Sequence, residues 1–216
     1  MPKLRTLDQA LESLTDGMTL MIGGFLAVGS PEALVDEVIR RGVRDLTLIV
    51  NDTAMPDRGY GRLFANGQII KLICCYMGMN PTAITQKDEG RLEVELCPQG
   101  SLAERIRAGG AGLGGILTPT GVGTVAEEGK LKMELDGRTF LLERPLRADM
   151  ALLRAHVADR AGNLIYRKSA RNFNPLMATA AGYVVAEASE VRDIGGIDPD
   201  HVMTPGIFVD AVVGVS

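Results

Sequence analysis

The sequence has 216 residues, of which 46% are hydrophobic and 23% charged, and its formal net charge is −4. We expect a single domain over residues 1–216, because each half would have only a small core if the chain were divided into two domains. The scattered Lys and Arg residues exclude the basic footprint of a nucleic-acid-binding protein. No stretch approaches the roughly 20 apolar residues of a membrane span, and the start lacks a signal peptide's apolar core, which together predict a cytoplasmic protein away from membranes.

The few cysteines and histidines favour neither a disulfide nor a metal site. Cys74 and Cys75 are adjacent, which disfavours a bridge between them, and Cys97 is left over. We expect these thiols to be buried apolar side chains in a reducing compartment. His156 and His201 have no Cys or His partner at ligand spacing, so we predict no metal site.

The chain is predicted to begin with an amphipathic helix and a buried strand. Thr6 and Gln9 are the ends of a capping box, and apolar residues follow at helical spacing up to Gly17. Residues 20–22 then have the composition of a buried strand.

A glycine loop joins this strand to the next helix. Gly23, Gly24 and Gly29 permit backbone angles and close approaches that a side chain would block. Ser30 is predicted to cap the helix, with Pro31 in its first turn. Such an arrangement suits an anionic or phosphate-bearing ligand, because unpaired amides and the helix dipole point toward it.

The remaining pattern predicts an α/β fold with an open, mostly parallel sheet and helices on both faces. A strand, a helix ending at Gly42 and a second strand within about thirty residues form a parallel crossover unit, with ligands near the carboxyl ends of the strands. A second capping box, Ser101 to Glu104, predicts a helix to about Ala108, and Asn174 begins a short helix. Further strands are predicted at residues 46–50, 69–75, 92–96, 150–155, 183–186 and 207–213.

Two other stretches have distinct local signals. Residues 109–123 are dense in glycine but retain apolar residues, which predicts an ordered loop rather than a flexible linker. Residues 130–135 alternate in polarity, and Asp136 and Gly137 are typical of a type I′ turn. Residues 138–142 would then form the second strand, antiparallel to the first. This pattern predicts a β-hairpin.

The glycine loop fits neither of two common nucleotide-binding motifs. A Walker loop needs Lys and then Ser or Thr after its last glycine, whereas Gly29 is followed by Ser30 and Pro31. The dinucleotide fingerprint G-x-G-x-x-G is also absent from residues 23–29. A nicotinamide-dependent oxidoreductase therefore remains an alternative that rests on the glycine loop alone.

The loop instead resembles the glycine signature of the family I coenzyme A transferases. That signature consists of Asp-Gly, a short apolar strand, Gly-Gly-Phe, three variable residues, Gly, one residue and Pro, and residues 16–31 contain every element. The resemblance covers nearly the whole chain and is closest to the alpha subunits of bacterial acetate or acetoacetate CoA-transferases. It continues through residues 51–54, 98–104, 108–112, 118–124 and 169–175.

This resemblance implies a subunit of an enzyme that moves CoA by covalent, ping-pong catalysis. The donor would be acetyl-CoA or succinyl-CoA, and the acceptor a short-chain acid such as acetoacetate, acetate or butyrate. CoA thioesters would be substrates, with no permanently bound cofactor. A non-catalytic CoA-binding or assembly subunit is the alternative.

The resemblance also implies a partner. The family's nucleophilic glutamate lies in a half that many bacterial members encode as a beta subunit, and its sequence setting is absent here. We therefore expect an α2β2 heterotetramer with the active site at a subunit interface. Glu127 and Glu128 are the local candidates if the nucleophile were in this chain, and otherwise are solvated charges.

Within this chain, Gln99 is the candidate catalytic residue, because its neutral amide could donate to the oxyanion of a tetrahedral intermediate. A turn residue that bonds its own loop is the alternative. Asn51, after the second strand, could hold the substrate carboxylate or the CoA chain, or simply form a turn. Arg171 is more simply explained by an ion pair with a core carboxylate, or by fixing the start of the following helix, than by substrate binding. The resemblance assigns CoA binding to Gly23, Gly24, Phe25, Leu26, Ala27, Val28 and Gly29, although this loop or the one at residues 109–115 could line the acyl pocket or a subunit contact instead.

Overall fold

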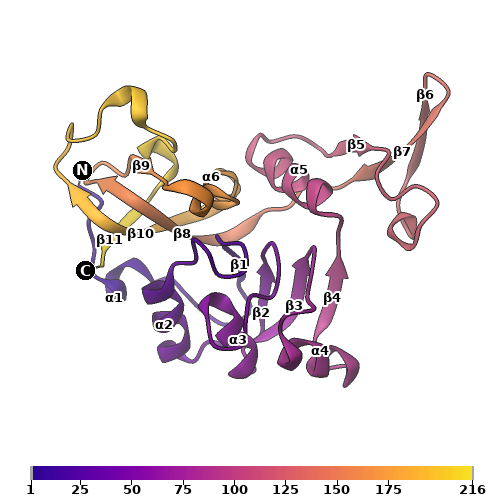
Figure 1. The fold of residues 1–216 in the computed structure, drawn as a ribbon, viewed down its shortest axis with the longest axis horizontal. Helices are drawn as coiled ribbons and strands as arrows, with labels where there is room; N and C mark the ends of the chain where they lie inside the picture. Colours follow the sequence, from indigo (N-terminus) through magenta and orange to yellow (C-terminus); the bar gives the residue numbers. More distant parts are fainter. Residues whose placement is uncertain (1, 216) are drawn as a thin grey trace.

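Eight strands of the computed structural model, which describes residues 2–215, form one mostly parallel sheet (Figure 1). The order is β11-β10-β8-β1-β2-β3-β4, every neighbouring pair along it is parallel, and β9 lies antiparallel beside β8. The strands are β1 (Thr19–Ile22), β2 (Leu46–Ile49), β3 (Ile69–Cys74), β4 (Glu93–Leu96), β8 (Ala148–Asp159), β9 (Leu164–Ile165), β10 (Ala181–Arg192) and β11 (Ala211–Gly214).

Helices cover both faces of this sheet, which confirms the predicted fold class (Figure 1). One face packs against α1 (Leu7–Ala10), α2 (Glu32–Arg41), α3 (Arg62–Ala65) and α4 (Pro81–Asp88). The other packs against α5 (Gln99–Gly110) and α6 (Asn174–Met177). Within residues 2–215, no helix is both long and apolar enough to cross a membrane.

The two cores follow from alternation along the central strands. Leu20 and Ile22 of β1 belong to the core under α2, whereas Met21 between them belongs to the core under α5. Leu48 and Ile49 of β2 divide in the same way. Successive side chains of a strand point to opposite faces, so a parallel sheet covered on both sides needs continuous apolar runs.

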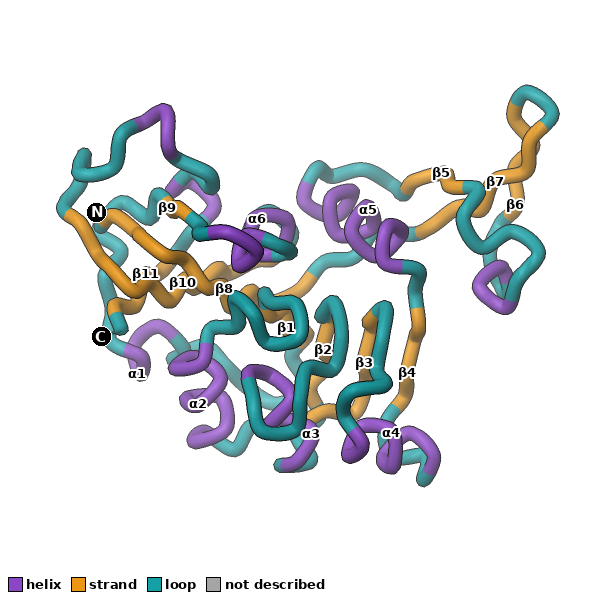
Figure 2. Tube along the Cα trace, viewed as in Figure 1, coloured by secondary structure: helices purple, strands orange, loops and turns teal. Residues whose placement is uncertain are grey.

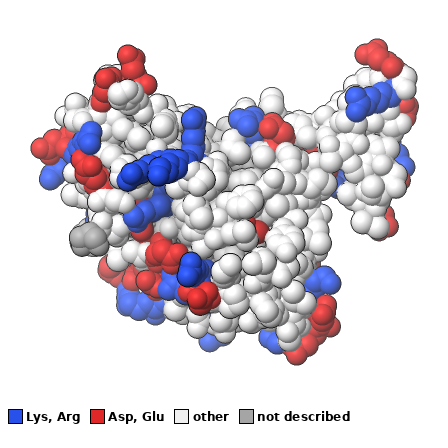
Figure 3. Space-filling model, viewed as in Figure 1, with Lys and Arg blue, Asp and Glu red and all other residues white. Residues whose placement is uncertain are grey.

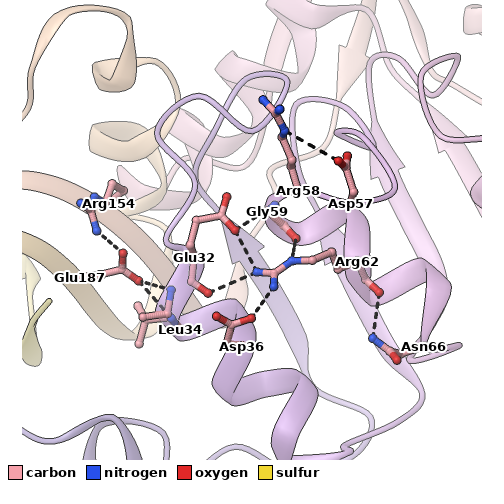
Figure 4. A network of polar contacts seen from close by, with 11 residues as sticks. Glu32, Leu34, Asp36, Asp57, Arg58, Gly59, Arg62, Asn66, Arg154 and Glu187 are labelled. Atoms are coloured by element: carbon pink, nitrogen blue, oxygen red, sulfur yellow. Dashed lines mark hydrogen bonds and ion pairs between the residues drawn. The ribbon is translucent and has the colours of Figure 1, made fainter. Parts of the chain in front are cut away.

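The carboxylate that caps α2 comes from a distant strand (Figure 4). The prediction that Ser30 caps this helix is wrong, because its buried hydroxyl has no hydrogen-bond partner within the described part of the chain. Glu187 of β10 instead accepts hydrogen bonds from the Ala33 and Leu34 amides, at 2.8 and 3.1 Å. Arg154 of β8 pairs with the same carboxylate. The start of α2 is thus fixed by two strands that lie far along the chain.

The start of α5 also differs from the prediction. The helix begins at Gln99, with Pro98 at its N-cap, so Ser101 is an interior residue and not a cap. The Pro98 carbonyl accepts the Leu102 amide at 2.8 Å, which closes the first turn three residues earlier than a cap at Ser101 would. Gly109 and Gly110 lie in the last turn of α5, not in a loop.

Other boundaries shift at the ends of the chain. The capping box at Thr6 is confirmed, but α1 ends at Ala10 and not at Gly17. The final strand begins at Ala211, because residues 206–208 form a 3₁₀ turn in which Ile207 is exposed. β8 and β10 are each 12 residues long, since they pair with each other well beyond their predicted ends.

The predicted hairpin is confirmed, and it belongs to a separate three-stranded sheet that projects from the molecule (Figure 1). We call this sheet the arm; it consists of β5 (Ile116–Thr118), β6 (Lys132–Leu135) and β7 (Arg138–Glu143). Asp136 and Gly137 have φ values of 48° and 71°, as a type I′ turn requires. β5 occupies part of the predicted glycine-dense loop.

Candidate functional site

A hollow of about 360 Å³ lies at the carboxyl ends of β1, β2, β3 and β4. Figure 2 shows the loops that leave β1, β2 and β3 gathered at this edge of the sheet. Each of the four strands contributes residues just past its end, as expected for a parallel α/β sheet. The lining residues are Phe25, Leu26, Asn51, Asp52, Cys75, Tyr76 and Gln99. The hollow therefore brings together the glycine loop, Asn51 and Gln99, three features that the sequence analysis selected separately.

The glycine loop forms a tight turn whose tip is not glycine. Phe25 and Val28 exchange both backbone hydrogen bonds, at 3.0 and 2.9 Å. Between them, Leu26 and Ala27 have φ values of 47° and 68°, in the left-handed region that disfavours residues with a Cβ. Such strain persists only where the surroundings enforce it, and it clusters at functional sites.

The glycines of this loop serve close approaches inside the chain. A Cβ on Gly23 would lie 1.9 Å from Asn174 Oδ1, and one on Gly29 would lie 2.8 Å from the Ala170 carbonyl oxygen. Gly24 has a φ of 141° and packs against Tyr60. Packing accounts for all three glycines, while Phe25 and Leu26 are the loop residues that face the hollow.

Asp52 connects the turn to the rest of the site. It is 1% exposed, and it accepts hydrogen bonds from four neutral donors. Oδ2 takes the Leu26 amide at 2.9 Å and Asn51 Nδ2 at 2.7 Å, while Oδ1 takes the Ala54 amide at 2.7 Å and the Tyr60 hydroxyl at 3.2 Å. Burial, with the Asp52 charge nearby, raises the pKa of Tyr60 well above its usual value, so this hydroxyl remains a donor.

Asp52 lies in the motif at residues 51–54, but no role was predicted for it from the sequence. The available signal was a carboxylate placed directly after a buried strand, beside the selected Asn51. Its partner Leu26 is 26 residues away, and that pairing depends on the turn conformation, which the sequence did not reveal.

Asn51 and Gln99 form an amide pair in the hollow. Gln99 Nε2 donates to Asn51 Oδ1 at 2.7 Å, and Asn51 in turn donates to Asp52, so the chain of hydrogen bonds orients both amides. The Gln99 amide group carries a second hydrogen. Gln99 is exposed and is the first residue of α5, so the positive end of the helix dipole lies beside the hollow. The arrangement can donate hydrogen bonds to an oxygen that becomes negatively charged.

Cys75 also lines the hollow. Its thiol lies 2.8 Å from the Asn51 carbonyl oxygen, to which it donates. Burial, with the Asp52 charge as the next contribution, raises the pKa of this thiol to about 11. Cys74 is the last residue of β3 and is buried in the core under α2, where burial raises its pKa to about 12; Cys97 is buried as well. The predicted burial is thus confirmed for Cys74 and Cys97, whereas Cys75 is partly exposed at the site.

The other candidate residues lie away from this hollow. Glu127 ends the 3₁₀ turn Val125–Glu127, which lies between β5 and β6 of the arm, and Glu128 follows it. Lys132 of β6 lies 2.7 Å from the Glu127 carboxylate and lowers its pKa. Gly109 packs α5 tightly, since a Cβ there would lie 1.9 Å from the Leu146 carbonyl oxygen. Arg171 ends a 3₁₀ turn, Lys168–Arg171, beside the glycine loop. Among residues 2–215, no three His, Cys, Asp or Glu side chains are grouped as metal ligands.

Comparisons with known proteins agree with this architecture. The family model described as coenzyme A transferase matches residues 4–214. The alpha subunit of the acetate CoA-transferase of Escherichia coli K12 is 54% identical over 211 residues, which cover 98% of this chain and 96% of the relative. One subunit of a probable succinyl-CoA:3-ketoacid coenzyme A transferase of Bacillus subtilis is 50% identical, covering 95% of this chain and 86% of the relative.

A solved structure has the same fold. An acyl-CoA transferase of Escherichia coli O157:H7, crystallised as a thioester complex with CoA, superposes with a TM-score of 0.87 at 21% identity. The match covers 99% of this chain but 47% of that longer one.

Proposed function

This chain belongs to the coenzyme A transferase family, and from that premise we propose that it is the alpha subunit of an enzyme that moves CoA from an acyl-CoA to a short-chain carboxylic acid. The names of its relatives supply the substrate classes: acetate for one, succinyl-CoA and a 3-keto acid for another. We propose acetyl-CoA or succinyl-CoA as the donor, and acetoacetate, acetate or butyrate as the acceptor. The observation that carries the proposal is the amide pair of Gln99 and Asn51 at the carboxyl edge of the sheet.

The reaction begins when a glutamate carboxylate attacks the thioester carbonyl of the donor. As negative charge develops on the carbonyl oxygen, this oxygen accepts a hydrogen bond from Gln99 Nε2. Collapse of this intermediate expels the CoA thiolate and leaves an acyl-glutamyl anhydride. The thiolate then attacks the glutamyl carbonyl, which releases the first acid and forms a glutamyl-CoA thioester, and the acceptor acid reverses both steps.

The nucleophilic glutamate belongs, on this proposal, to a beta subunit. Asp52 is the carboxylate among the lining residues, and four donors already engage its two oxygens. An oxygen so engaged is a poor nucleophile, because attack would require giving up those hydrogen bonds in a buried place.

Exposed apolar side chains around the hollow support a docked partner. Phe25, Tyr76 and Leu96 are 43%, 50% and 54% exposed, and all three lie at or next to the ends of the strands that form the site. Exposed apolar groups gathered in one place are typical of interaction surfaces. We propose an α2β2 heterotetramer in the cytoplasm that uses CoA thioesters as substrates and holds no resident cofactor.

The decisive experiment measures acetoacetyl-CoA formation from acetyl-CoA and acetoacetate. The purified chain is assayed alone and after mixing with the beta subunit from the same source. Activity in the mixture and none from either subunit supports a shared site with the glutamate supplied by the partner. Activity from this chain alone would contradict that division and direct attention to Glu127 and Glu128, and a beta subunit without an essential glutamate would favour the non-catalytic alternative.

A further inference from the structure

A second hollow, of about 490 Å³, adjoins the turn at residues 25–28 from the other side. Val28 lines it, whereas Phe25, directly opposite Val28 in the turn, lines the first hollow. Its polar lining includes Arg154, His156, Arg167 and Lys168, and none of its lining residues is Asp or Glu. A chain with a net charge of −4 thus has a basic hollow, lined by these four residues, next to its candidate reaction site.

The charges of this basic hollow are not all balanced by the protein. Arg154 pairs with buried Glu187 and also donates to the Ser189 hydroxyl. Arg167 and Lys168, by contrast, have no carboxylate within 4.0 Å among residues 2–215. Figure 3 shows Lys and Arg side chains side by side over the region between β9 and α6, where this segment lies. Two cations with no counter-charge beside them leave a net positive hollow.

Residues 167–174, which include Arg167 and Lys168, are fixed to the glycine turn by hydrogen bonds, and their backbone is strained at Lys168. Asn172 Nδ2 donates to the Val28 carbonyl at 2.8 Å, and Asn174 Nδ2 donates to the Gly29 and Ala170 carbonyls at 3.1 and 2.9 Å. Lys168 has a φ of 52°, an unusual conformation for a long side chain. The turn and the cations therefore form one unit, and the left-handed residues Leu26, Ala27 and Lys168 all belong to it.

We propose that this basic hollow binds the phosphate groups of CoA through Arg167 and Lys168, while the thioester end reaches the Gln99 hollow across the turn. The inference rests on the proposed function, since it concerns how the same substrate is held. CoA carries its phosphates and its thiol at opposite ends of a pantetheine arm, and the two hollows lie on opposite sides of one turn. Charge-assisted hydrogen bonds from Arg and Lys are the usual means of holding phosphate oxygens.

The test compares two donors on the assembled enzyme of alpha and beta subunits. Acetyl-CoA has the nucleotide phosphates, whereas acetyl-pantetheine has the same thioester without them. In the double variant R167Q/K168Q, we expect KM for acetyl-CoA to rise about tenfold or more, the equivalent of about 1.4 kcal/mol or more. KM for acetyl-pantetheine and kcat for both donors should stay within about twofold of the wild-type values.

The double variant K87Q/R91Q is the matched control, because it removes two cations that lie at the end of α4 and pair with neighbouring acidic residues. It should leave both KM values unchanged. An equal KM change for both donors, or no change for either, would overturn the proposal. So would failure of R167Q/K168Q to assemble with the beta subunit, which would show that the hollow contacts protein.

A failure of the proposed function would look different, because the wild-type mixture would then turn over neither donor. Calorimetric binding of CoA and of pantetheine to the same complexes would still test the hollow. Weaker binding of CoA alone to R167Q/K168Q would support the proposal without any turnover, and unchanged CoA binding would refute it.

Discussion

The proposed reaction edge and the arm are built by different kinds of interaction; by reaction edge we mean the carboxyl ends of β1 to β4, which surround the hollow with Gln99 and Asn51. In the arm, strand alternation and the Asp136-Gly137 turn are set by neighbouring residues. At the reaction edge, the decisive contacts join distant residues, as when Gln99 meets Asn51 or Glu187 caps α2. Local signals are sufficient for the arm, whereas the site exists only when the whole sheet has assembled.

The largest expected effect tests the dependence on distant contacts. Replacing Glu187 with Ala should lower the free energy of unfolding by about 3–5 kcal/mol, because Arg154 and two helix amides would lose a buried partner. Urea denaturation measures this change. The control E190A removes an exposed carboxylate paired with Arg192 and should cost less than about 1 kcal/mol.

A small loss in E187A would contradict the comparison, because α2 would then be fixed by its own sequence. The variant E187Q separates the two contributions, since its carbonyl oxygen can still accept from the helix while the ion pair is lost. We expect its stability to lie between those of the wild type and E187A.

Replacing Gln99 with Ala tests the chemistry at the reaction edge. Loss of the oxyanion donor should lower kcat of the assembled enzyme by about 10²–10³-fold, the range found when one such donor is removed. Because Gln99 is exposed at a helix start, the free energy of unfolding should hardly change. Steady-state kinetics and urea denaturation on the same preparation distinguish a catalytic role from a structural one. An unchanged kcat would leave Gln99 with a structural role alone, as the hydrogen-bond partner of Asn51.

The same division explains what the sequence could predict. The strands and the hairpin were predictable because apolar runs, alternation and turn residues are local features. The caps at Ser30 and Ser101 were wrongly predicted, since a carboxylate 154 residues away serves α2 and Pro98 starts α5 early. Asn51 and Gln99 could be selected from their motifs, but the Asp52 network that orients Asn51 could not, because it requires two left-handed residues at the turn tip.

The pKa of Cys75 gives a sharper test of burial at the reaction edge. Only the thiolate reacts with alkylating reagents, and a pKa of about 11 in place of 9.0 lowers its fraction at pH 8 by about 100-fold. Alkylation of Cys75 by iodoacetamide should therefore be slow at pH 8 and should accelerate about tenfold for each pH unit up to about pH 11. Peptide mass spectrometry of the labelled chain measures the rate. A rate that levels off near pH 9 would contradict the raised pKa and show that the Cys75 thiol is solvated as in bulk water.

The smallest expected effect concerns the arm. Replacing Gly137 with Ala places a Cβ on a residue with a φ of 71°, which should cost about 1 kcal/mol. If the arm depends on local signals, amide hydrogen exchange should accelerate about fivefold in β6 and β7 while the main sheet keeps its protection.

The control for the arm is Gly114→Ala, because Gly114 has no positive φ and a Cβ there would meet no atom within 4 Å. This change should leave exchange in the arm unaffected or slightly slower. Faster exchange throughout the main sheet of G137A would break the comparison, since the arm and the reaction edge would then unfold as one cooperative unit. Protection lost in the arm alone means that the arm can open while the site stays intact, and that the site's order depends on its own long-range contacts.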